Sequence, residues 1–167
     1  SVKHSHIFKA SFLHPSGIDI IKIKVGKNEQ GYVCDKRNSC LRFITNVHVF
    51  HANKFIGTVQ IHSIPLSWNP KVLTVIPNSH TIAVSESTKI FLLGLDNSLT
   101  SGELYLVLDN LNAPRGLCIS PMVPNSLLVA DGHHVLEVDL ANKNVTTVVQ
   151  NFCKAFDIAI ASNETVA

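Results

Sequence analysis

The chain has 167 residues, of which 46% are hydrophobic and 16% charged, and its formal net charge is +2. This composition excludes an intrinsically disordered chain, because enough apolar side chains are present to form a core. No apolar run reaches the roughly 18 residues of a membrane-spanning helix, and the charge is far below that of a polycation. The sequence begins at Ser1, without an initiator methionine or an apolar signal segment, so we expect a processed chain or an internal fragment. The sequence does not indicate the cellular compartment.

A repeated segment organises the chain. Pro15, Pro70 and Pro114 each begin a stretch of the form Pro-x-x-apolar-x-apolar, and a second hydrophobic stretch that ends in a polar turn follows each of them. A fourth copy aligns at Ala155. Internal periods of roughly 20 to 50 residues are typical of solenoids and propellers.

Apolar–polar alternation and β-branched residues predict four short strands in each of the three copies. In chain order we expect strands at 17–20, 32–34, 40–44 and 55–64; at 72–76, 81–84, 89–93 and 103–108; and at 116–119, 127–130, 134–139 and 145–150. No stretch of about a dozen residues shows helical periodicity with caps. Four antiparallel strands per repeat form one blade of a β-propeller.

We therefore expect an all-β chain that is a segment of one β-propeller domain, with the ring incomplete in this chain. The predicted units are an outer strand of a preceding blade at 1–12, blades at 13–66, 67–110 and 111–152, and the truncated start of a fourth blade at 153–167. Closed propellers have roughly four to eight blades. The remainder of the propeller or a second copy would then be needed to close the ring.

The motifs of the repeat resemble the NHL repeat, the blade unit of a family of β-propellers. The matching residues are Pro15, Gly17, Val33, Asp35, Asn38 and Leu41 in the first copy, and Pro114, Gly116, Val129, Ala130 and Asp131 in the third. The third copy has a shorter turn without the Asn, and the second has Val72 and Ser85 in place of the Gly and Asp. The resemblance covers about residues 12 to 167. It implies four-stranded propeller blades, a fold that hosts binding modules and enzymes alike.

Loops at one end of the blades are the candidate binding surface. In an antiparallel meander, the turns after each second strand and before each first strand lie on the same face. The candidate partner-binding residues there are His14, Lys36, Arg37, Asn38, Lys71, Lys89, Arg115, His133 and His134. The alternative is a solvated loop face whose Asp35 and Asp131 stabilise turns. Since several NHL propellers bind protein or RNA on the corresponding face, the resemblance favours a partner-binding surface.

The sequence therefore predicts an NHL-type interaction module, a rigid scaffold that binds a protein partner. One alternative is a metal-dependent lyase or hydrolase with its site at the central channel, as in the NHL-like peptidylglycine amidating lyase, and the other is RNA binding by the mildly basic loop face. The nine histidines include no His-x-x-x-His pair with a glutamate, and Cys-x-x-Cys is absent. No catalytic residue, metal ligand or cofactor is predicted.

Cysteine usage leaves one question open. Four cysteines are too few for a disulfide scaffold in a chain of this length. Cys34 and Cys40 flank one turn, so a disulfide across the hairpin fits the spacing. A buried thiol fits equally well, because Cys34 occupies the position of Ala130 in the third copy.

Overall fold

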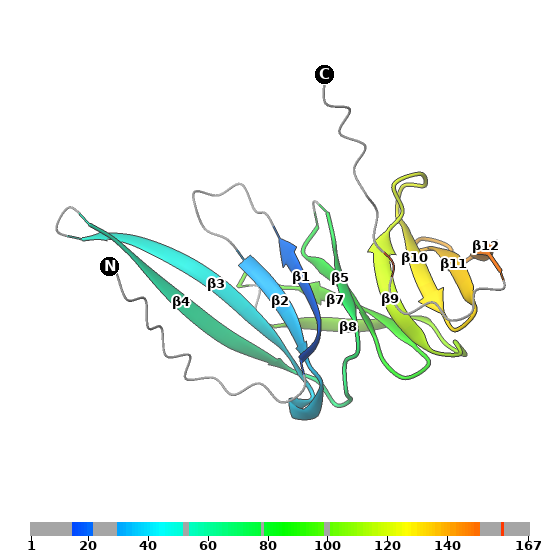
Figure 1. Cartoon of the computed structure of the whole chain (residues 1–167), viewed down its shortest axis with the longest axis horizontal. Helices are drawn as coiled ribbons and strands as arrows, with labels where there is room; N and C mark the ends of the chain where they lie inside the picture. Colours follow the sequence, from blue (N-terminus) through cyan, green and yellow to red (C-terminus); the bar gives the residue numbers. More distant parts are fainter. Residues whose placement is uncertain are drawn as a thin grey trace, which may run out of the picture.

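The computed structural model describes residues 15–21, 30–51, 54–77, 79–98, 101–150 and 158. Within these ranges, twelve strands form three four-stranded antiparallel sheets, each in meander order (Figure 1). The first sheet contains β1 (Pro15–Ile21), β2 (Gln30–Asp35), β3 (Cys40–His51) and β4 (Lys54–Pro65). The second contains β5 (Leu73–Ile76), β6 (Thr81–Ser85), β7 (Ile90–Leu95) and β8 (Gly102–Leu108), and the third β9 (Pro114–Ile119), β10 (Ser126–Asp131), β11 (His134–Asp139) and β12 (Val145–Val149).

The all-β fold class and the strand predictions are confirmed. Each of the twelve predicted strands is present, and the described residues contain a single helical turn, the 3₁₀ turn η1 (Lys36–Asn38) between β2 and β3. Each sheet lies inside one of the predicted units 13–66, 67–110 and 111–152. The predicted outer strand at 1–12 lies outside the described residues, as does the segment 153–167 apart from Ile158. Across the described ranges, no helix is long and apolar enough to span a membrane.

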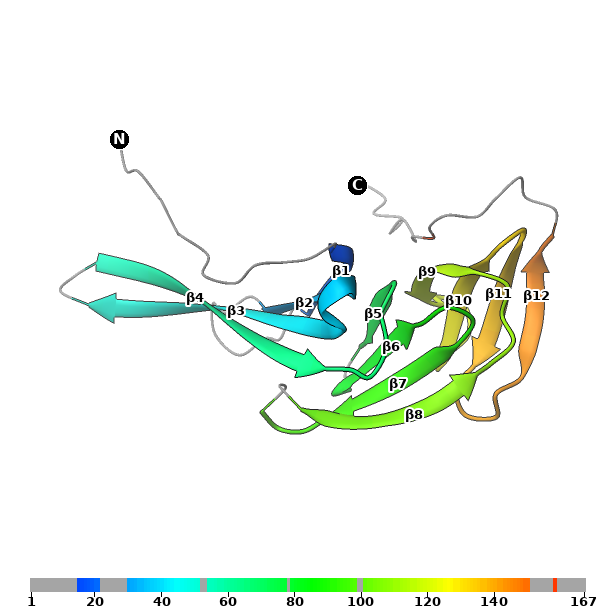
Figure 2. The same cartoon turned by 90° about the horizontal axis from the view of Figure 1, so that it is seen from below.

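The hairpin of β3 and β4 is longer than the sequence predicts. β3 was expected to end at Ile44, but it continues to His51. β2 pairs with β3 only as far as Thr45, whereas β4 pairs with β3 along its whole length, up to the His51–Lys54 pair. The end of the hairpin therefore projects beyond the sheets as a two-stranded arm (Figure 2).

The hydrophobic cores lie between the sheets. The first strand of the second sheet, β5, contacts β1 on one side and β9 on the other. One core joins the first and second sheets through Tyr32, Cys34, Leu41, Phe43, Ile64, Leu73, Ile82, Val84, Leu93 and Leu95. The other joins the second and third sheets through Ala83, Ile90, Val107, Leu111, Leu117, Leu127, Val129 and Val138. Because successive strand residues point to opposite faces, β6 supplies Ile82 and Val84 to one core and Ala83 to the other.

Equivalent hydrogen bonds fix the two linkers between sheets. The backbone N–H of Leu66, after the first sheet, donates to the carbonyl oxygen of Ser39 at 2.8 Å. The N–H of Leu111, after the second sheet, donates to the carbonyl oxygen of Thr88 at 3.0 Å. Ser39 and Thr88 both belong to the turn between the second and third strands of their sheets. The sequence repeat is thus a structural repeat down to individual backbone bonds.

The turn aspartates have structural partners. Asp131, 3% exposed, accepts hydrogen bonds from the backbone N–H groups of Ala113 (2.6 Å) and Asn112 (3.0 Å). Asp35, fully buried, accepts from Asn38 Nδ2 (2.7 Å) and forms an ion pair with Arg42 Nε (3.0 Å). The carboxylates of Asp35 and Asp131 therefore stabilise the turns and linkers around them.

Candidate functional site

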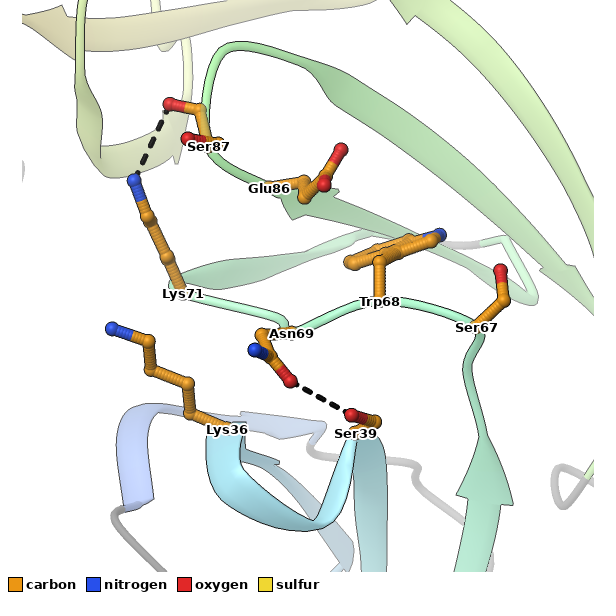
Figure 3. A pocket seen from close by; sticks show the side chains of 8 residues that line it. All are labelled: Lys36, Ser39, Ser67, Trp68, Asn69, Lys71, Glu86 and Ser87. Atoms are coloured by element: carbon orange, nitrogen blue, oxygen red, sulfur yellow. Dashed lines mark hydrogen bonds between the residues drawn. The ribbon is translucent and has the colours of Figure 1, made fainter.

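A polar pocket of about 580 Å³ opens where the first and second sheets meet. Three separate segments line it, namely the turn after β2, the linker between the sheets and the turn after β6. The lining residues are Lys36, Ser39, Ser67, Trp68, Asn69, Lys71, Glu86 and Ser87 (Figure 3). Lys36 and Lys71 lie on one side of the pocket, and Trp68 and Ser67 lie on the other.

The linker that forms the pocket floor is held at both ends. Beyond the Leu66 bond, Ser39 Oγ donates to Asn69 Oδ1 at 2.7 Å, which ties the linker to the turn of the first sheet. The N–H of Lys71 donates to the carbonyl oxygen of Ser85 at 2.9 Å, which ties it to the end of β6. The pocket walls are therefore fixed by the fold before any partner arrives.

Trp68 is anchored by ring stacking. Its indole lies 4.9 Å from the Phe91 ring, centroid to centroid, with 20° between the planes. It also packs against the core between the first and second sheets. A half-buried aromatic ring with a fixed orientation offers contact area to a partner at low entropic cost.

Positive charges gather at the opposite wall. Partial burial of the Lys71 ammonium lowers its pKa from 10.5, and the positive charges of Lys36 and Arg115 lower it further, while the Glu86 carboxylate acts in the opposite direction. Lys71 Nζ donates to the carbonyl oxygen of Ser87 at 3.3 Å. In the described ranges neither Lys36 nor Lys71 forms an ion pair with a carboxylate. This wall is therefore suited to an anionic group.

The structure brings some of the predicted residues together and separates others. Lys36 and Lys71 line the pocket, and Arg115 lies close enough to influence Lys71. Arg37 and Asn38 belong to η1, where Asn38 bonds Asp35. Lys89 instead forms an exposed ion pair with Asp109, 3.5 Å from Nζ to Oδ2. His133 lies in the turn after β10 and His134 begins β11, and neither lines the pocket. His14 lies outside the described residues.

The pocket also contains residues that the sequence did not single out. Ser39, Ser67, Trp68, Asn69 and Ser87 contribute to its walls. The available signal was the single tryptophan of the chain, placed in a Ser-Trp-Asn-Pro linker between two strands. An aromatic residue in a connecting segment favours a binding role more than one in a core strand does.

Cys34 and Cys40 do not form the disulfide that their spacing allows. Cys34 pairs with Leu41 across β2 and β3, and Cys40 pairs with Asp35. Since Cys34 and Cys40 thus occupy adjacent rungs of the ladder, their side chains point to opposite faces of the sheet. Among the described residues, Cys34, Cys40 and Cys118 form no disulfide, and the first two are buried. Burial raises the pKa of the Cys34 and Cys40 thiols. Of the two arrangements that the spacing allows, the structure therefore has the buried thiols.

Metal-ligating side chains are scattered through the described part of the chain. No group of three or more His, Cys, Asp or Glu side chains there lies close enough to hold a metal ion.

One comparison with known proteins bears on the fold. No protein-family model and no curated protein matches the chain. Among solved structures, it is similar to the crystal structure of a putative 6-phosphogluconolactonase from Bacteroides uniformis, with a TM-score of 0.50 and 16% sequence identity. The match covers 83% of this chain and 41% of that one, so the chain spans less than half of its length. At this identity the likeness supports a propeller-like β-fold, and it does not confirm NHL repeats.

Proposed function

We propose that the chain is an NHL-type propeller module, a rigid scaffold that binds a protein partner through the loops at one end of its sheets. One observation carries this proposal: three separate segments converge there on a polar pocket whose lysines form no ion pair in the described ranges. The Arg115 side chain and the exposed residues Arg37 and His133 extend the same end of the sheets. Preformed walls on a rigid scaffold favour binding of a partner, because few side chains and loops of the pocket must lose conformational entropy when the partner binds.

The ring of the propeller is part of the same proposal. The described residues form three four-stranded sheets, which are fewer than the roughly four to eight blades that close a propeller. Further blades or a second copy would then cover the outer faces of the first and third sheets. Light scattering tests the second-copy arrangement: it predicts a particle of twice the 18.3 kDa mass of this chain. A monomer would leave closure to further blades.

Site-specific photo-crosslinking tests the binding function. A photoreactive phenylalanine analogue placed at Arg37 or His133, both exposed at the loop end, is expected to capture a protein from an extract of the producing cells. The matched control places the same group at Asn142, exposed in the turn between β11 and β12 at the opposite end of the sheets. Protein adducts from the loop end but not from Asn142 support the proposal. Adducts only from Asn142, adducts with RNA alone, or no adducts contradict it.

A hydrolase is the second candidate, favoured by the likeness in fold to a protein described as a 6-phosphogluconolactonase. The two lysines of the pocket could bind the phosphate group of such a substrate. Hydrolysis of 6-phosphogluconolactone above its spontaneous rate, lost in Lys36→Gln and Lys71→Gln, would favour the enzyme over the scaffold. An unchanged spontaneous rate leaves the binding module as the better description.

A further inference from the structure

The pocket between the first and second sheets is a built site. Its linker is fixed by the bonds of Leu66 and Lys71 to the two flanking turns, by the Ser39–Asn69 hydrogen bond, and by stacking of Trp68 on Phe91. Pro70, in the middle of the linker, is fully buried. The lining side chains are thus held by the backbone around them, in contrast to an ordinary solvated loop.

The charges of the pocket are arranged by sign. Figure 3 shows Lys36 and Lys71 together on one wall, with Glu86 nearer to the Trp68 wall. Within the described ranges the two ammonium groups lack a carboxylate partner, and their mutual repulsion together with Arg115 adds to the cost of burying Lys71. A bound anion would relieve that cost, because an opposite charge favours the charged form of a lysine.

The position of Glu86 distinguishes between anionic partners. RNA carries a negative charge at every nucleotide and requires a continuous basic track. Glu86 would repel the chain of phosphates as it crossed the pocket. A peptide can instead place one carboxylate beside Lys36 and Lys71 and a neutral amide or hydroxyl beside Glu86. The pocket volume of about 580 Å³ suits a few side chains.

We propose that this pocket binds an acidic peptide segment of the partner, with a carboxylate between Lys36 and Lys71 and the adjoining part of the peptide against Trp68. The inference rests on the proposed binding function and specifies the chemistry of its partner. Charge-assisted hydrogen bonds to ammonium groups supply the specificity for the carboxylate. The indole supplies contact area at the opposite wall.

Trp68 provides a built-in reporter, because it is the only tryptophan of the chain. The full chain is titrated with a ten-residue peptide that alternates Glu and Gly, and tryptophan fluorescence is recorded. The same peptide with Gln in place of Glu is the neutral control, and a ten-nucleotide uridine RNA is the competing class. We expect the Glu peptide to change Trp68 emission saturably and the Gln peptide to leave it unchanged.

Matched variants locate the site. Lys36→Gln and Lys71→Gln are each expected to weaken peptide binding about tenfold, the size expected for loss of one charge-assisted hydrogen bond. Lys143→Gln removes the same charge from the turn at the opposite end of the sheets and is expected to leave the affinity unchanged. Circular dichroism confirms that each variant is folded.

Three results would overturn the inference: equal weakening by Lys143→Gln, equal binding of the Gln peptide, or tighter binding of the RNA. The two proposals fail separately. Capture of a protein from Arg37 with no fluorescence response to the Glu peptide leaves the binding module standing and removes the acidic peptide. Binding of the peptide at Trp68 without any captured protein supports the pocket and contradicts the module.

Discussion

The carboxylate of Asp131 accepts a hydrogen bond of 2.6 Å from the backbone N–H of Ala113, a residue eighteen positions earlier in the chain. A second bond, from the N–H of Asn112, completes the contact. The end of the second strand therefore holds the linker that enters the same sheet. The carboxylate needs these donors, because it is 3% exposed and a buried polar group without partners loses its hydration with no compensation.

Asp131→Ala is expected to lower the free energy of unfolding by about 1–3 kcal/mol, because it removes two hydrogen bonds to a charged acceptor that fix the linker. Urea denaturation measures the loss. The control is Asp109→Asn, which removes the charge from an ion pair exposed by 39% on each side and is expected to cost less than about 1 kcal/mol. Equal losses in the two variants would show that the Asp131 hydrogen bonds contribute no more to the free energy of unfolding than an exposed ion pair does.

Gly94 and Gly102 lie on adjacent rungs of the ladder of β7 and β8, opposite Glu103 and Leu95 respectively. A Cβ atom on Gly102 would lie 2.1 Å from the Gly94 carbonyl oxygen, whereas a Cβ on Gly94 would meet nothing nearer than 3.7 Å. Gly102→Ala is expected to destabilise the protein by about 1–3 kcal/mol, because backbone atoms must move apart. Gly94→Ala is expected to change the melting temperature little. The reverse order of the two melting temperatures would contradict this geometry.

Stability is expected to fall at alkaline pH. Burial raises the pKa of Cys34 above 9.0 and, with a smaller contribution from the Asp96 charge, raises that of Tyr32 above 10.0. Above these ordinary values the unfolded chain has released protons that the folded chain retains. The unfolded state then binds fewer protons, so the free energy of unfolding decreases as pH rises. Urea denaturation at a series of pH values from about 8 to 11 measures the decline.

Cys34→Ala is the control for the alkaline prediction. The substitution installs the residue that the third copy has at Ala130 and removes one of the buried acids. The decline just above pH 9 is expected to be shallower in this variant. A decline of the same steepness would assign the effect to other groups.

Thiol labelling tests the state of the cysteines. Because the thiolate is the reactive form, burial and a raised pKa are expected to protect Cys34 and Cys40 from iodoacetamide in the native protein. Cys118, which is partly exposed, is expected to be modified before either of them. Mass spectrometry of digested protein, labelled with and without urea, measures the order. A peptide that joins Cys34 to Cys40 under non-reducing conditions would contradict the free thiols.

The sequence predicted the strands well because strand periodicity is local. The extension of β3 was missed although Asn46, Val47, His48 and Val49 continue the alternation of polar and apolar residues. The antiparallel strand order was enough to predict which turns lie together at one end of the sheets. The pocket did not, because stacking of Trp68 on Phe91 and the bond between Ser39 and Asn69 depend on how one sheet packs on the next. Residues that are far apart in the sequence carry no local signal of that packing.

The position of both cores between sheets has a consequence for folding. Tyr32 of the first sheet and Leu127 of the third are fully buried, yet each is covered by side chains of the second sheet. A single sheet made alone would expose half of a core, so none of the three should be stable in isolation. Strand β6 contributes Ile82 and Val84 to one core and Ala83 to the other, so it couples the two cores. A shift of β6 by one residue would turn each of these side chains toward the opposite core. The middle sheet thus makes unfolding of the three sheets a cooperative event.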